Sequence, residues 1–182
     1  MITKIKKYKD STVEPTDELL KKIDSWIPFS FRIGTWNHCF YCGIEPTDAD
    51  HLVPLSMLTL EKRNSSHCNY GITAPSCREC NSLLSNLYFD SLMERCQFAN
   101  QKLRKKYSKL LNTPNWEPSE LKQVGNGLVG YIIEKQQLKN AVVDRILWQS
   151  KHEFREMFQE SIERTIAYHP HNKNLLNFIN PS

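Results

Sequence analysis

The fold is decided between residues 39 and 81, where the chain reads CFYCG at 39–43, DADHLVPLS at 48–56 and SCRECN at 76–81. Two C-x-x-C pairs stand 34 residues apart, one made by Cys39 and Cys42 and the other by Cys77 and Cys80. Such pairs in a chain without a recognisable secretory signal are typical of a tetrahedral zinc site, because each two-residue spacer turns two thiolates toward one ion. Disulfides and unligated core thiols are the alternatives. The segment therefore predicts structural zinc on four cysteines.

The composition of the chain is that of a globular protein. Of its 182 residues 40% are hydrophobic and 24% are charged, which excludes wholesale disorder. No run approaches the roughly 18 apolar residues of a membrane helix. The lysine-rich residues 1–10 are not followed by the apolar stretch of a secretory signal. We expect a cytoplasmic (intracellular) protein with no membrane partner.

The net charge of +4 is unevenly placed. Residues 86–116 carry six basic side chains against Asp90 and Glu94, whereas basic and acidic residues balance in the rest of the chain. In a helix over 90–111, four of these side chains share a flank beside an apolar stripe: Lys102, Lys105, Lys106 and Lys109. A local excess of this kind favours a polyanionic partner such as DNA, although charge alone also fits a solvated helix face.

The order of strand and helix patterns predicts an α+β fold. We expect a basic arm and short helix at 1–36, a zinc-stapled core at 37–88, and a mostly helical C-terminal extension at 89–182. The expected elements are a helix over 17–26, strands over 49–55 and 72–74, a helix from Cys77 toward Leu87 capped by Ser76, and helices over 90–111, 128–148 and from 154 to His169-Pro170. Cys96 falls on the apolar stripe of its helix and is predicted to lie in the core.

Asp50 and His51 lie between the cysteine pairs, and Asn81 comes directly after the last cysteine. The order Cys-x-x-Cys, Asp-His, Cys-x-x-Cys-Asn resembles the HNH nucleases, also called ββα-metal nucleases, and above all their zinc-stapled branch, which includes phage endonuclease VII. The chain departs from the common pattern at two positions. Ile72 stands where many HNH proteins have asparagine, and Leu84 stands where lysine is often seen. Only the segment that holds the cysteines carries the resemblance.

The resemblance implies a strand with Asp-His, a second strand and a helix that crosses them. It makes His51 the general base, and it makes Asp50 and Asn81 the ligands of one catalytic divalent ion, Mg²⁺ or Mn²⁺. The chemistry of the residues agrees, because histidine titrates near neutral pH and hard oxygen ligands suit magnesium, while soft thiolates suit zinc. Adjacent residues of a flat strand point to opposite faces, so Asp50 and His51 share a site only where the strand ends, twists or bulges.

These features predict a metal-dependent endonuclease that hydrolyses DNA phosphodiester bonds. The lysine flank is expected to contact the DNA backbone, with Arg63 and Arg78 as further phosphate contacts near the site. Two alternatives stay open, a zinc-stabilised nucleic-acid-binding module without catalysis and an assembly protein whose zinc core only displays its helices. His67 and Cys68 are interpreted as loop residues, since four thiolates already fill a tetrahedral site. The sequence does not distinguish duplex from branched DNA as the substrate, or a monomer from a homodimer.

Overall fold

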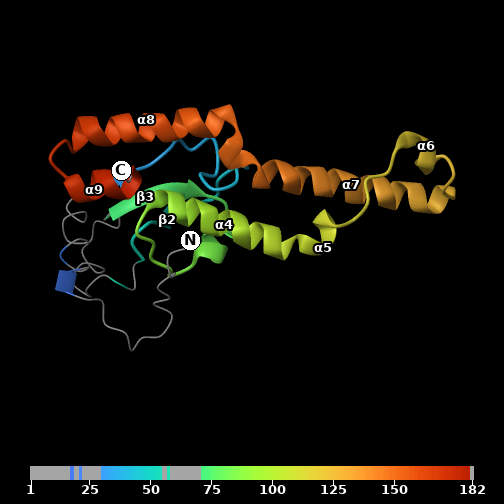
Figure 1. Cartoon of the computed structure of the whole chain (residues 1–182), viewed down its shortest axis with the longest axis horizontal. Coiled ribbons are helices and arrows are strands. Elements are labelled where there is room, and N and C mark those ends of the chain that lie inside the picture. Colours follow the sequence, from blue (N-terminus) through green and yellow to red (C-terminus); the bar gives the residue numbers. More distant parts are fainter. Residues whose placement is uncertain (1–16, 19–20, 22–29, 55–56, 58–70, 181–182) are drawn as a thin grey trace.

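The computed structural model describes residues 17–18, 21, 30–54, 57 and 71–180. The predicted N-terminal arm, most of the helix expected over 17–26, and the residues Arg63, His67 and Cys68 lie outside this part of the chain. The described part has an α+β fold, in which a small sheet packs among helices at one end of the molecule (Figure 1).

The sheet has three strands in the order β1-β3-β2. β1 (Ser30–Arg32) runs parallel to β3 (Gly71–Ser76), and β2 (Asp48–His51) runs antiparallel to β3. β2 begins one residue before the predicted strand and ends four residues earlier, ahead of Pro54, which has no N–H to donate to a ladder. β3 is longer than predicted at both ends.

The two faces of the sheet differ in burial. One face is buried, and it carries Asp50 of β2 and Leu52, which follows the last residue of β2. The other face carries Ala49, which is exposed, and His51 and Thr73, which are half-buried. His51 pairs with Thr73 in the register of β2 and β3, so β2 stays regular up to its last residue. The side chains of Asp50 and His51 therefore point to opposite faces of the sheet.

Helix α3 (Arg78–Leu84) follows β3 directly. Its N-cap is Cys77, whose Sγ accepts a hydrogen bond from the backbone N–H of Cys80 at 3.4 Å. Ser76, the predicted cap, instead donates its hydroxyl to the Cys77 carbonyl at 3.1 Å, so the prediction of the cap was wrong by one residue. The helix also ends three residues before Leu87, because Ser85 turns the chain with a positive φ of 45°.

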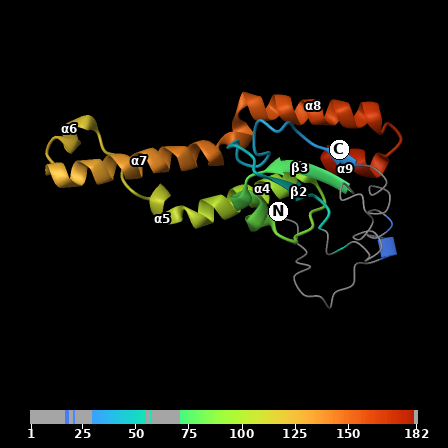
Figure 2. The same ribbon diagram turned by 180° about the vertical axis from the view of Figure 1, so that it is seen from behind.

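The C-terminal half is helical. Its elements are α4 (Leu92–Lys106), α5 (Ser108–Leu111), α6 (Pro118–Leu121), α7 (Asn126–Ile146), the short 3₁₀ helix η2 (Trp148–Ser150), α8 (His152–Tyr168) and α9 (Lys173–Ile179). α5, α6 and the first part of α7 extend away from the sheet as an arm (Figures 1 and 2). The helix predicted over 90–111 is divided at Tyr107, and α9 lies beyond the predicted last helix. Within the described ranges, no helix is both long and apolar enough to span a membrane.

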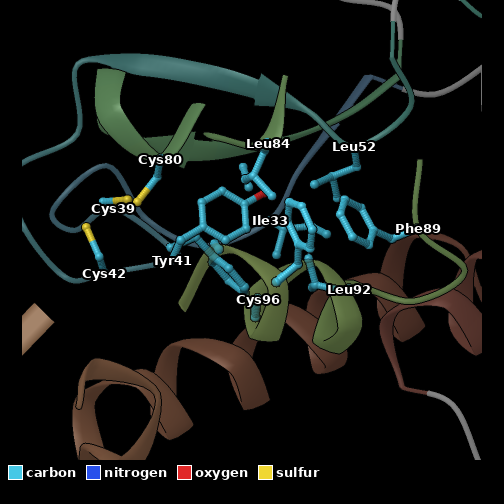
Figure 3. Close-up of a cluster of buried hydrophobic side chains, with 14 of the residues drawn as sticks. Ile33, Cys39, Tyr41, Cys42, Leu52, Cys80, Leu84, Phe89, Leu92 and Cys96 are labelled. Atoms are coloured by element: carbon cyan, nitrogen blue, oxygen red, sulfur yellow. The ribbon is translucent and has the colours of Figure 1, made fainter. Parts of the chain in front are cut away.

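The hydrophobic core crosses the predicted boundary between residues 88 and 89. Trp148 of η2 packs on the first cysteine loop, and its indole N–H donates to the Phe40 carbonyl at 3.2 Å. Gly43 is required there, because it has a φ of +76° and a Cβ at this position would stand 2.5 Å from the Trp148 ring. Cys96 is fully buried, as predicted. The helical segment is thus part of the same core as the sheet and is not a separate extension (Figure 3).

Candidate functional site

Four buried cysteine sulfurs meet beside the sheet. Cys39 and Cys42 come from the loop after β1, and Cys77 and Cys80 come from the start of α3. Their sulfur atoms all lie within 4.8 Å of one another, and those of Cys42 and Cys77 are 3.7 Å apart. A tetrahedron with metal–sulfur distances of about 2.3 Å has sulfurs about 3.8 Å apart. The predicted cysteine cluster is confirmed, and it can hold a metal ion such as zinc. Figure 3 shows three of these side chains converging.

Backbone hydrogen bonds hold the first cysteine loop in place. The Gly43 N–H donates to the Cys39 carbonyl at 2.9 Å, and the Phe40 N–H donates to the Pro75 carbonyl of β3 at 2.8 Å. Hydrogen bonds within the cluster lower the pKa of Cys42 and of Cys77 and raise the pKa of Cys39 and of Cys80, so the four thiols share their protons. The thiolate is the form of cysteine that binds a metal, and binding of an ion would release the remaining protons.

Arg145 of α7 faces the cysteine cluster. Its Nη2 lies 3.6 Å from the Sγ of Cys42 and 4.0 Å from the Sγ of Cys77, and it pairs with Glu79 at 2.6 Å. Four thiolates around one dication carry a net charge of −2, which a neighbouring guanidinium offsets. Arg145 is 103 residues from Cys42 in the chain, and nothing in the local sequence indicated this contact.

Replacing Arg145 with methionine should lower the zinc affinity of the protein by about 10–100-fold, the usual effect of losing a partner of the metal ligands. The measurement is competition for zinc with a chromogenic chelator. Lys106→Met is the matched control, because Lys106 also pairs with Glu79 but none of its contacts reaches the sulfurs. Equal zinc affinity in the two variants would show that the guanidinium does not stabilise the cluster.

Asp50 lies in the core and not at an open cation site. Arg95 of α4 binds its carboxylate through Nη2–Oδ1 at 2.7 Å and Nε–Oδ2 at 2.8 Å, and the Tyr41 hydroxyl donates to Oδ2. The Arg95 and Asp50 side chains are 0% and 2% exposed. The prediction that Asp50 and Asn81 hold a divalent ion does not fit this structure, since the ion would have to displace a buried guanidinium.

The sequence carried one signal of this ion pair. Arg95 stands three residues after Leu92 and four before Ala99, so a charged side chain lies on the apolar stripe of α4. Its remaining donors bind the Leu87 carbonyl at 2.7 Å and the His51 carbonyl at 3.4 Å. The pair therefore joins α4 to the end of β2.

Breaking this buried pair should be costly for stability. Arg95→Met leaves the Asp50 carboxylate unpaired in the core, and it should lower the free energy of unfolding by about 3–5 kcal/mol. Changing Asp50 to leucine as well should restore part of the loss, because two apolar side chains leave no buried charge. The measurement is urea unfolding in saturating zinc. Arg104→Met, on the exposed side of α4, is the control, and equal stability of the two single variants would contradict the assignment.

His51 ends β2 on the less buried face of the sheet. Among the described residues, no hydrogen bond involves its ring. Burial lowers its pKa from the ordinary value of 6.5, and the Asp50 charge opposes this shift in part. The lowered pKa favours the neutral imidazole, which is the form that can accept a proton. Asn81 is half-buried on α3, which packs against β2, and Arg78 is exposed at the first position of that helix.

The predicted lysine flank divides into two kinds of side chain. Lys105 and Lys109 are exposed, and no ion pair within the described ranges involves them. Lys106 pairs with Glu79 of α3, and the Lys102 ammonium lies 5.0 Å from the centre of the Phe98 ring. Lys102, Lys105 and Lys106 lie on α4 and Lys109 lies on α5, and two of the four already have partners within the protein.

The comparisons with known proteins were made at the level of families, of curated proteins and of solved structures, and none gives a match. The likeness to HNH nucleases accordingly depends on the residues of this chain. The site that follows from the geometry is a four-cysteine cluster able to hold a metal, with His51 at the end of a neighbouring strand.

Proposed function

We propose that this chain hydrolyses DNA phosphodiester bonds, with His51 as the general base. The observation that carries the proposal is the state of His51, which stands at the end of β2 with a lowered pKa and with its ring unbonded among the described residues. A general base has to be unprotonated at the working pH and within reach of water. The lowered pKa and the half-buried position of His51 support this role, whereas a structural histidine of the core usually has its ring nitrogens satisfied by protein groups.

The surrounding architecture supports the same proposal. β2, β3 and α3 follow one another along the chain as strand, strand and helix, the order that the resemblance to HNH nucleases implies. In our proposal the four cysteines bind zinc, which clamps the first loop to the start of α3. Its role is structural, because four thiolates leave no open position for water on a tetrahedral ion.

In the proposed reaction, His51 takes a proton from a water molecule whose oxygen attacks phosphorus. The bond from phosphorus to the leaving sugar oxygen breaks, and that oxygen takes up a proton from solvent. Asp50 acts as a positioning residue, because its pair with Arg95 fixes the end of β2. Asn81 alone offers one neutral oxygen, too few for a magnesium site without a carboxylate, so no step is assigned to a cation.

Cleavage assays test the proposal directly. Purified protein is incubated with supercoiled, linear, single-stranded and four-way-junction DNA, with magnesium, with manganese, or without added divalent ion. We expect new DNA ends from at least one of these substrates. Absence of cleavage in every condition, by protein with full zinc content, would contradict the hydrolase assignment. The dependence on added ion shows whether a catalytic cation takes part.

A zinc-stabilised nucleic-acid-binding module is the second candidate. The observation that favours it is the ion pair in which Arg95 binds both carboxylate oxygens of Asp50, because these oxygens were expected to hold the catalytic ion. Such a module would bind DNA without cutting it. Binding that survives in a protein inactive on all four substrates would support this candidate.

The lysine flank of α4 and α5 should contribute to DNA affinity through counterion release. Replacing Lys102, Lys105, Lys106 and Lys109 with glutamine should make the salt dependence of binding shallower by about 0.9 in slope for each phosphate that the protein no longer neutralises. We expect most of the change from Lys105 and Lys109, because the other two have partners within the protein. The control removes four charges elsewhere: Lys151, Arg155, Arg164 and Lys173. The same slope in the wild type and in the four-lysine variant would show that these lysines only solvate the two helices.

A further inference from the structure

Three side chains form a row across the less buried face of the sheet. Arg32 of β1 pairs with Thr73 of β3, and Thr73 pairs with His51 of β2. Residues paired in neighbouring strands lie on the same face of a sheet. The residues that follow Arg32 and His51 point the other way and are fully buried, as the register requires. Two strand spacings place the Cα atoms of Arg32 and His51 about 10 Å apart.

Arg32 and Trp36 form an exposed pair at one end of this row. The guanidinium carbon of Arg32 lies 4.9 Å from the centre of the Trp36 ring, and Trp36 is 41% exposed. In the part of the chain that the structure describes, Arg32 has no acidic partner. A guanidinium stacked on an aromatic ring keeps the N–H donors in its plane available to a phosphate.

We propose that Arg32 and Trp36 bind a single strand of DNA that passes over His51. Arg32 contacts the phosphate next to the one at which His51 acts, and Trp36 stacks on a base. The inference deepens the proposed hydrolysis of DNA by naming the form of the strand at the site, and it rests on that proposal.

Two features point to a single strand. A side chain that stacks on a base needs that base unstacked from its neighbours, which single strands offer and intact duplex does not. Stacking on an aromatic side chain is also tolerant of sequence, because every base has a π face. An arginine and an exposed tryptophan together therefore match a phosphate and the base attached to it.

The test is binding of a fluorescent single-stranded oligonucleotide and of its duplex, measured by anisotropy at several salt concentrations. All variants are made in the His51→Ala background, so that no substrate is cut. Arg32→Gln should make the salt slope for the single strand shallower by about 0.7. Trp36→Ala should weaken single-strand binding about 5- to 150-fold and leave duplex binding unchanged, and Trp36→Phe should restore much of the loss.

Arg155→Gln is the matched control, since it removes an exposed arginine of α8. An unchanged salt slope in Arg32→Gln would overturn the inference, as would equal losses for single strand and duplex in Trp36→Ala. Cleavage by the wild-type protein separates the two proposals. If the wild-type protein cuts DNA but Arg32→Gln and Trp36→Ala do not change binding, the proposed hydrolase is supported and the strand site is contradicted. If both variants weaken binding as expected but the wild-type protein cuts no DNA, the strand site is supported and the hydrolase is contradicted.

Discussion

Cys42→Ser and Cys80→Ser proteins are expected to be largely unfolded at neutral pH and to carry little zinc. Zinc bound by four thiolates contributes on the order of 10 kcal/mol of apparent binding free energy, and the whole stability of a domain is typically about 5–15 kcal/mol. The cluster joins the first cysteine loop to the start of α3, so its loss separates segments that the core brings together. Circular dichroism and elemental analysis of the purified proteins measure the two effects.

Cys96→Ala is the control for the cysteine variants. Cys96 is as buried as the four clustered thiols but is not one of them, so its replacement should leave zinc content and fold intact. A wild-type protein without zinc, or one that keeps its fold after the metal is removed by a chelator, would contradict the structural role of the cluster.

The cysteine cluster could be predicted from sequence because its information is local. The two-residue spacer of each C-x-x-C pair brings two thiolates together within one turn of the chain. Two such pairs supply the four ligands of one tetrahedral ion, so the spacing alone predicts that the pairs meet. Strands β2 and β3 and helix α3 were similarly predicted from turn residues and periodicity, whereas strand β1 was not predicted. The binding of zinc itself stays a prediction, as does the relation to HNH nucleases.

Tertiary contacts place Asp50 in a buried ion pair and pack the helical extension into the same core as the sheet, which local sequence patterns do not indicate. Asp50 and His51 could share a site only if the strand ended, twisted or bulged there. β2 does end at His51, but its register with β3 stays regular through that residue, so the two side chains lie on opposite faces. The partners Arg95 and Arg145 come from helices far along the chain; the place of Arg95 on the apolar stripe of α4 indicated burial but not its partner, and no local pattern indicated the contact of Arg145. The contact between Trp148 and Gly43 joins the two sides of the boundary predicted between residues 88 and 89. This contact forms only in the folded chain, so no local pattern indicates it.

The error at the C-terminus has a different cause. Helix α9 has an ordinary signature, with Asn172 as its cap and with Leu175, Phe178 and Ile179 on one buried face. His169-Pro170 ends α8, as predicted, but helical structure resumes three residues later. The division of the helix at Tyr107 had no such signal, because the apolar period runs through it without glycine or proline.

His51→Ala should slow DNA cleavage by about 10²–10⁴-fold, the usual range for loss of a general base. The side chain is half-buried, and its ring has no hydrogen-bonded partner in the described part of the chain, so its removal should leave the fold unchanged. Zinc content and affinity for DNA should also stay at the wild-type level. His152→Ala is the matched control, because it removes an exposed histidine of α8 that pairs with a neighbouring glutamate.

Single-turnover cleavage by the wild-type, His51→Ala and His152→Ala proteins, each with confirmed zinc content, tests the proposed hydrolase most directly. Our account predicts that the wild-type and His152→Ala proteins cut at the same rate and that His51→Ala is slower by at least about 10²-fold at equal DNA affinity. Cleavage by His51→Ala at the wild-type rate would contradict the account.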